Sequence, residues 1–181
     1  MESNTCAVMK LNYEDVYKRE QEVLAKESDE DFTFRILQRD DFKRGHLQTL
    51  AQLTQVGNPT QQDYEARFDD MFPKYTDHYR IVVIVDKKKD KIVGSGTVFI
   101  EKKFLRECGI CGHIEDIAVD STYRGKKLGI RLIKMLKEIS QLHHCYKIVL
   151  DCSDANVPFY EANGFKIKER CMAIYPEYPK L

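Results

Sequence analysis

The residues best suited to chemistry lie in one stretch, where a strand-like run leads directly into a glycine-containing turn. The run is Ile114-Glu-Asp-Ile-Ala-Val119, and the turn is Arg124-Gly-Lys-Lys-Leu-Gly129 at the start of a long amphipathic segment. The first N–H groups of a helix have no partner inside the helix, and its dipole adds partial positive charge at that end. Glycines let an anion approach the backbone, and three cations add charge. The pattern can form a site for a phosphate-bearing ligand, but a glycine pair alone favours the other interpretation, a solvated helix start with incidental lysines.

The turn differs from two common nucleotide-binding loops. It lacks the Gly-Lys-Ser/Thr ending of a P-loop, and it lacks the three glycines of the dinucleotide-binding motif.

A second group of chemically useful residues is acidic. Glu115 and Asp116 are neighbours on the expected strand, and Asp151 ends another apolar run. Adjacent residues of a regular strand point to opposite faces, so Glu115 and Asp116 can serve one ligand only if the strand bulges. Carboxylates placed in this way suit binding and deprotonation of an amine, although they could equally be charges on the rim of a site.

The six cysteines do not predict a metal site. Cys108 and Cys111 have the spacing of half a zinc site, and His143-His144-Cys145 resembles another half, but flanking turns of the usual kind are missing. Cysteines beside apolar runs more often pack as small hydrophobic residues. Cys152 lies beside Asp151, so a reactive thiol is one interpretation, and buried packing is the favoured one.

Hydrophobic periodicity places these residues on one α+β domain with a central mixed sheet. Alternation or β-branched runs predict strands at 32–37, 79–86, 91–101, 112–120, 146–151, 165–170 and 171–175. Apolar residues at helical spacing predict helices at 40–57, 60–72, 124–143 and 156–163. The polar residues 1–31 are interpreted as an appendage to a domain that spans 32–181.

Composition excludes several classes of protein. The 181 residues are 43% hydrophobic and 32% charged, with 29 basic and 29 acidic side chains. This balance indicates a water-soluble globular protein and argues against a nucleic-acid binder held by a general basic field. We find neither a membrane-spanning apolar stretch nor a secretion signal, so a cytoplasmic protein with reduced thiols is expected.

Several blocks of the chain resemble the eukaryotic glucosamine-6-phosphate N-acetyltransferases of the GNAT superfamily. Arg124 and Gly129 match the superfamily's Arg/Gln-x-x-Gly-x-Gly/Ala signature, with Lys127 where the central glycine is usual. The more specific blocks are 53–57, 111–119, 145–152 and 156–165, and the resemblance covers about residues 32–175.

The resemblance implies the GNAT fold and transfer of acetyl from acetyl-CoA to the 2-amino group of glucosamine 6-phosphate, on the route to UDP-N-acetylglucosamine. The amine is implied to attack the thioester directly in a ternary complex. The implied acetyl-CoA contacts are Ile117, Ala118, Val119, Arg124, Gly125, Lys126, Lys127, Leu128, Gly129, Ile130, Asn156 and Tyr160. Tyr160 is implied to protonate the departing thiolate; from periodicity alone it could equally be a core aromatic.

On the sugar side, the resemblance implies Thr54, Lys103, Arg106, Glu115, Asp116 and Asp151 as contacts, with Glu115 and Asp151 handling the amine proton. It also implies a homodimer with shared active sites and an exchanged C-terminal strand. Members of the family usually carry a C-terminal arginine that reaches the sugar phosphate, whereas this chain has Tyr175. A GNAT enzyme for another amine and a catalytically silent acyl-CoA-binding regulator remain the alternatives.

Overall fold

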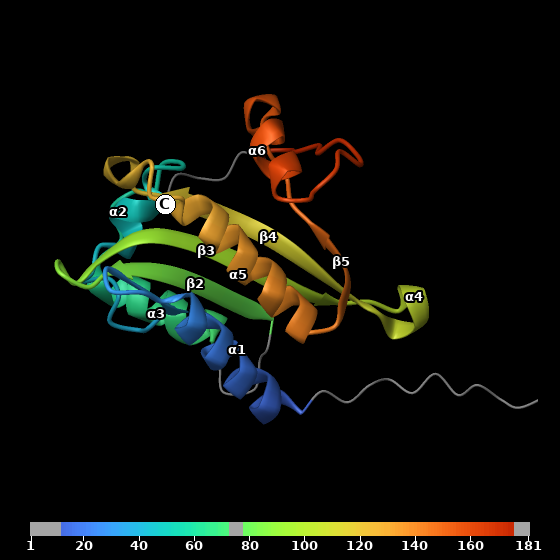
Figure 1. Ribbon diagram of the computed structural model, residues 1–181, viewed down its shortest axis with the longest axis horizontal. Coiled ribbons are helices and arrows are strands. Elements are labelled where there is room, and N and C mark those ends of the chain that lie inside the picture. The colour runs from blue at the N-terminus through green and yellow to red at the C-terminus, as the bar shows by residue number, and fades with distance from the viewer. Residues whose placement is uncertain (1–11, 73–77, 176–181) are drawn as a thin grey trace, which may run out of the picture. The chain divides into compact units, whose positions relative to one another are not determined.

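A computed structural model describes residues 12–72 and 78–175, which form two compact units divided between Leu150 and Asp151. The first unit contains a five-stranded sheet in the order β1-β2-β3-β4-β5. Its strands are β1 (Phe32–Ile36), β2 (Tyr79–Asp86), β3 (Lys91–Lys102), β4 (Ile110–Val119) and β5 (Cys145–Val149). The first four strands are antiparallel to their neighbours, and β5 runs parallel to β4. The sheet is therefore mixed, as predicted (Figure 1).

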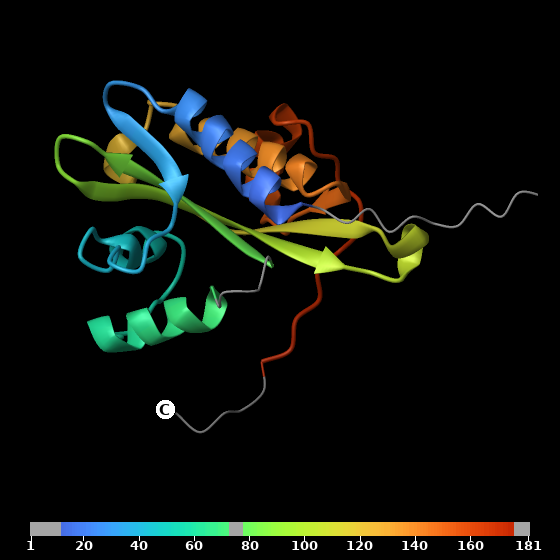
Figure 2. The ribbon, with the colours of Figure 1, turned by 90° about the horizontal axis from the view of Figure 1, so that it is seen from below.

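Helices cover both faces of this sheet. Helices α1 (Tyr13–Glu27) and α5 (Leu128–Leu142) lie on one face, and α2 (His46–Leu50) and α3 (Gln61–Met71) lie on the other (Figure 2). The short helix α4 (Leu105–Cys108) lies between β3 and β4. Gly96 on β3 permits close packing of α5, because a Cβ atom there would lie 2.8 Å from Leu136 Cδ1.

Most of the predicted elements are present, with two shifted helix starts. Thr60 caps α3 as expected, through a reciprocal pair of hydrogen bonds with Asp63. The helix expected from residue 124 begins only at Leu128, and the helix expected from residue 40 begins at His46. Both starts follow residues in the left-handed region, Lys127 at φ +57° and Gly45 at φ +79°.

The described part of the expected appendage is packed on the sheet unit. Val16 and Leu24 of α1 are buried, and α1 contacts α5 and β1. Glu20 is fully buried, and its Oε1 accepts from Arg80 Nε at 2.8 Å and from His143 Nε2 at 2.6 Å. Residues 13–27 therefore contribute to the core of the first unit. Only three side chains of α1 are buried, so the mostly polar sequence of this helix does not indicate that it packs on the domain. Residues 1–11 lie outside the described part of the chain.

The two final strands predicted at 165–175 are not formed. This segment follows α6 (Val157–Ala162) in the second unit, and its Ile167, Met172, Ile174 and Tyr175 are exposed. Apolar alternation describes a surface that a strand can bury, but a strand forms only where another strand supplies its hydrogen bonds. Within this single chain no such partner is present among the described residues. The exchange of this strand in a dimer stays a prediction.

No helix in the described ranges combines the length and the apolar character needed to cross a bilayer.

Candidate functional site

The second half of β4 is open on the side that faces β5. Pairing with β5 covers only Ile110, Cys111, Gly112 and His113 of β4. Beyond this point the two parallel strands diverge (Figure 1). Within the described chain, the backbone from Ile114 to Val119 therefore has a strand neighbour only on the β3 side. Free N–H and C=O groups along such an edge can bind an extended, amide-containing ligand in the manner of an added strand.

A bulge interrupts β4 at the predicted place. Thr97 pairs with Glu115, whereas Ser95 pairs with Ala118, so β4 carries one extra residue between these pairs. Asp116 adopts φ +52°, in the left-handed region. The bulge removes the strict alternation of side chains, and Glu115 and Asp116 both line the same cavity. The condition that the sequence set for a shared role of these carboxylates is thus met.

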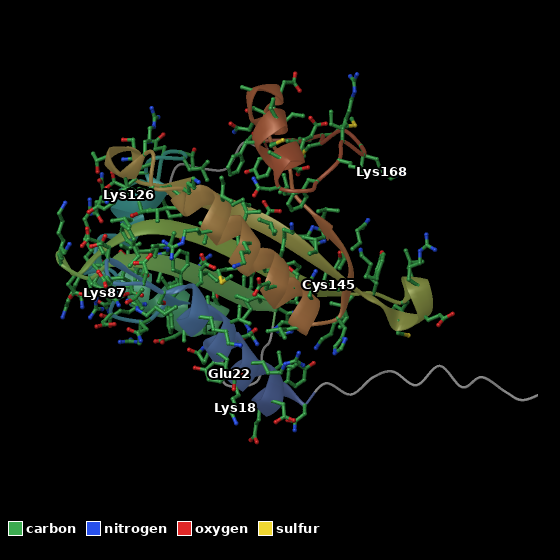
Figure 3. All side chains as sticks on the ribbon, in the orientation of Figure 1. Lys18, Glu22, Lys87, Lys126, Cys145 and Lys168 are labelled. Atoms are coloured by element: carbon green, nitrogen blue, oxygen red, sulfur yellow. The ribbon has the colours of Figure 1, made fainter. Side chains whose placement is uncertain are left out.

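The turn between β4 and α5 presents backbone amides and cations to solvent. Lys127 occupies the N-cap position of α5 without a side-chain cap, so the first amides of this 15-residue helix remain available. Arg124, Gly125, Lys126 and Lys127 are exposed, while Leu128 anchors the helix in the core. Figure 3 labels Lys126 in this turn, where its Nζ lies 5.4 Å from the centre of the Phe32 ring.

A network of charged hydrogen bonds holds this turn. Asp120 accepts from the Thr122 backbone N–H at 3.0 Å and from Lys91 Nζ at 2.7 Å. These partners, Lys91 above all, lower the pKa of Asp120 to about 2. Tyr123 donates to Asp86 at 2.6 Å, and the bond lowers the pKa of Asp86 and contributes to raising that of Tyr123. The turn is therefore positioned before any ligand arrives.

A cavity of about 780 Å³ lies between the sheet and the α2–α3 face. Its lining is mostly apolar, with contributions from Leu47, Leu50, Phe68, Met71, Ile81 and Phe99 among others. Its polar side chains are His46, Tyr64, Arg67, Ser95, Thr97, Glu101, His113, Glu115 and Asp116. A cavity of this size, with a few convergent polar groups, suits a small polar ligand.

His46 is a buried histidine of the cavity wall, with 4% of its surface exposed. Its Nδ1 lies 2.9 Å from Tyr64 Oη and its Nε2 lies 3.0 Å from Ser95 Oγ. Burial lowers the pKa of His46 to about 4, and burial also raises the pKa of Tyr64. The His46 side chain is therefore neutral at physiological pH, and both of its ring nitrogens have hydrogen-bond partners inside the protein.

The other predicted sugar contacts of this unit lie outside the cavity lining. Thr54 is exposed after α2, and Arg106 is exposed in α4 at φ +55°. Lys103 Nζ contacts Glu101 Oε2 at 2.6 Å, which raises the pKa of Lys103. A phosphate at Lys103 therefore has to compete with Glu101.

The second unit contains the remaining predicted site residues. Tyr160 on α6 is half-buried, packs edge-on against Phe159 and Phe165, and has a pKa raised chiefly by burial. Asn156 occupies the N-cap position of α6 but makes no capping side-chain bond, and Asp151 is exposed.

The expectation that Cys152 packs as a buried residue is wrong. Cys152 is exposed because it follows the end of β5 at Val149, and Cys171 is exposed because the strand predicted around it is not formed. Cys145 is partly buried, and Cys111 is the cysteine that lies in the core.

Comparison with known proteins identifies the family. The family model described as "Acetyltransferase (GNAT) family" matches residues 33–165, which include the bulge, the turn and α5. The chain belongs to the GNAT acetyltransferase family. The resemblance found in the sequence and the predicted fold are therefore confirmed, and the protein is an acyltransferase.

Relatives within the GNAT family carry a more specific name. The chain is 49% identical over 154 residues to glucosamine 6-phosphate N-acetyltransferase 1 of Dictyostelium discoideum, which covers 84% of this chain and 97% of that protein. It is 42% identical over 146 residues to the glucosamine 6-phosphate N-acetyltransferase of Arabidopsis thaliana, covering 81% and 97%. The crystal structure of the glucosamine-6-phosphate N-acetyltransferase from Arabidopsis thaliana superposes with a TM-score of 0.78 at 41% identity, covering 82% of this chain and all of that chain.

In this GNAT domain, sequence reasoning missed part of the cavity wall. Arg67 lines the cavity but was not predicted as a site residue. It immediately precedes Phe68 of the apolar stripe of α3, and this position is the signal that the sequence offers. His46 and His113 also line the cavity, and neither was predicted as a site residue.

Proposed function

We propose that this GNAT enzyme transfers acetyl from acetyl-CoA to the 2-amino group of D-glucosamine 6-phosphate. The observation that carries the proposal is full-length similarity to proteins of that named activity, which spans 97% of two of them. The bulged strand and the adjoining cavity are the local features that such a reaction requires, because they place carboxylates beside an open strand edge.

Acetyl-CoA fits the open edge and the turn. The pantetheine arm carries two amides, which match the backbone of Ile117, Ala118 and Val119, where β4 has no strand neighbour on the β5 side in the described chain. The pyrophosphate fits the amides that begin α5, beside the exposed Arg124 and Lys126. With the thioester fixed at the bulge, backbone N–H groups there polarise its carbonyl as negative charge develops on the oxygen.

The sugar amine must be neutral to attack. Glu115 binds the ammonium form and accepts its proton, directly or through water. Nitrogen then bonds to the thioester carbon and releases its second proton to solvent, and the carbon–sulfur bond breaks as the tetrahedral intermediate collapses.

Tyr160 donates its hydroxyl proton to the departing CoA thiolate. A raised pKa keeps this hydroxyl protonated at neutral pH, as a general acid requires. We expect Tyr160→Phe to lower turnover by roughly 10²-fold or more, with little change in acetyl-CoA affinity. Binding is measured by calorimetry and turnover by product formation; collapse of affinity with preserved turnover per bound cofactor would assign Tyr160 to binding instead.

The proposal includes a cytoplasmic homodimer. Exposed Ile167, Met172 and Ile174 form an apolar segment that a second copy could bury by pairing with it. The cysteines described in the structure are all free, in keeping with a reducing compartment. Sedimentation at several concentrations, with Ile174→Asp as the comparison, tests the assembly: we expect a dimer that this variant weakens.

The activity is tested by offering acetyl-CoA with glucosamine 6-phosphate, unphosphorylated glucosamine and a panel of primary amines. We expect acetylated glucosamine 6-phosphate as the preferred product, identified by mass spectrometry. Preference for another amine would make the chain a GNAT enzyme of different specificity. Tight acetyl-CoA binding without any acetylated product would make it an acyl-CoA-binding regulator.

A further inference from the structure

A mixed cluster of potential metal ligands lies where β3 and β4 pair. The side-chain ligand atoms of Glu101, Cys111 and His113 all lie within 4.8 Å of one another. Among residues 12–72 and 78–175, no other group of three His, Cys, Asp or Glu side chains meets this condition. The catalytic proposal above assigns no role to any of the three.

The backbone holds these three side chains on a rigid frame. Glu101 on β3 pairs directly with Cys111 on β4, and His113 lies two residues farther along β4, on the same face. Cys111 is only 1% exposed, whereas the side chains of Glu101 and His113 are 36% and 33% exposed. The cluster thus has a buried sulfur at its base and two ligands reachable from solvent.

The present contacts show how an ion would enter. His113 Nε2 lies 2.8 Å from Glu101 Oε2, and Lys103 Nζ lies 2.6 Å from the same oxygen. The Lys103 ammonium therefore occupies the position of a cation in front of this carboxylate. Ligand atoms of a tetrahedral zinc site lie roughly 3.3–3.8 Å apart. Side-chain rotations that move the three ligand atoms by about 1 Å would therefore bring them to this spacing.

We propose that Glu101, Cys111 and His113 form a binding site for a thiophilic divalent cation of the zinc class. On binding, the Cys111 thiol releases its proton to solvent, His113 coordinates through Nε2, and the ion displaces Lys103 from Glu101. Thiolate and imidazole select zinc-like ions over magnesium or calcium, which prefer oxygen ligands. Three protein ligands leave a fourth position open to water or to another small ligand.

The site has a direct consequence for the cavity, because Glu101 and His113 both belong to its lining. An ion there changes the charge at the cavity wall and frees the Lys103 ammonium. For the activity proposed above, on which this consequence rests, we expect zinc ion to alter the KM for the sugar phosphate and to leave the KM for acetyl-CoA unchanged.

The binding test uses the full chain, with a phosphine as reductant because thiol reductants bind zinc. Titration with cobalt(II) is expected to produce a sulfur-to-metal charge-transfer band that saturates at one equivalent of cobalt per chain. Zinc is expected to displace the cobalt. Cys111→Ser should abolish the band, while Glu101→Gln and His113→Gln should weaken zinc binding by roughly tenfold or more. Both latter side chains are partly exposed, so these variants test the site even where Cys111→Ser fails to fold.

Cys108→Ser is the matched control, because Cys108 is the exposed cysteine of neighbouring α4 and stands three residues from Cys111. Its band and zinc affinity should equal those of the unaltered chain. The proposal is overturned if the unaltered chain gives no band, if the band survives in Cys111→Ser, or if Cys108→Ser abolishes it. Since binding needs no substrate, its failure is distinguishable from failure of the proposed activity.

Discussion

The cavity wall and the turn before α5 each depend on a side chain whose pKa lies below its ordinary value, but for opposite reasons. In the cavity wall, His46 is surrounded by Tyr64, Ser95 and apolar groups, and burial excludes its charged form. In the turn, Asp120 is close to Lys91 and Thr122, whose hydrogen bonds favour its charged form. One region is organised by removing water, and the other by pairing charges.

This difference matches the ligands assigned to the two regions. A largely apolar wall that carries the Glu115 carboxylate suits an amine that must lose its proton, whereas a turn with fixed charges and exposed amides suits a pyrophosphate that arrives fully ionised. Changes in the cavity should therefore affect the sugar and the chemical step, and changes in the turn should affect acetyl-CoA.

The largest effect is expected for Glu115→Gln at the cavity. The amide cannot accept the amine proton, so kcat/KM for the sugar phosphate should fall by about 10²- to 10⁴-fold. The affinity for acetyl-CoA should stay within twofold, as measured by calorimetry. Glu30→Gln, which changes an exposed glutamate outside the cavity lining, is the control and should be active. A loss of acetyl-CoA affinity as large as the loss of kcat/KM for the sugar phosphate would contradict separate roles for the cavity and the turn.

The next effect concerns stability and tests burial of His46. Its pKa is about 4 in the folded protein and 6.5 when unfolded, so the unfolded chain binds a proton first as the pH falls. This group's contribution is complete above pH 6.5 and is lost toward pH 4, at a cost of about 3 kcal/mol. In urea unfolding, the free energy of unfolding of the unaltered chain should therefore fall by about 3 kcal/mol more between pH 7 and pH 4 than that of His46→Gln. Parallel pH profiles would refute a neutral, buried histidine.

The turn could be predicted from sequence because its information is local. Gly125 at φ +83°, the amphipathic residues from Leu128 and the preceding strand lie within a few positions of one another. Likewise, the alternation rule for Glu115 and Asp116 stated the condition that the bulge satisfies.

The cavity could not be predicted in the same way, because it joins segments that are distant in the chain. His46 and Ser95 are 49 positions apart, and nothing local to either indicates their contact. For a similar reason the sequence does not indicate the burial of Glu20, since its partner His143 lies 123 positions away in the chain. The prediction of two final strands at 165–175 was wrong because apolar alternation cannot supply a pairing partner.

A smaller effect is expected for Asp120→Asn in the turn. The variant loses the ion pair with Lys91, whose side chain is 42% exposed, so solvent screening limits the loss in unfolding free energy to about 1 kcal/mol. The folded-state pKa of about 2 lies below the ordinary 3.8, so this stabilisation is present above pH 3.8 and is lost as the pH falls toward 2. We expect the KM for acetyl-CoA to rise several-fold and the KM for the sugar to stay constant; the reverse pattern would contradict the assignment of the turn.

The smallest expected effect separates the contribution of the backbone conformation at Lys127 from the contribution of its charge. Lys127 at φ +57° costs about 1–2 kcal/mol for a residue with a Cβ, whereas glycine adopts this conformation freely and pays about 0.5–1 kcal/mol in entropy. Lys127→Gly and Lys127→Ala remove the same ammonium, but only the glycine relieves the strain. Lys127→Gly should therefore exceed Lys127→Ala in unfolding free energy by up to about 1 kcal/mol, measured by urea titration at constant protein concentration. If the alanine variant were the more stable, the left-handed geometry would not be what glycine supplies at this position, and Lys127 would act through its charge alone.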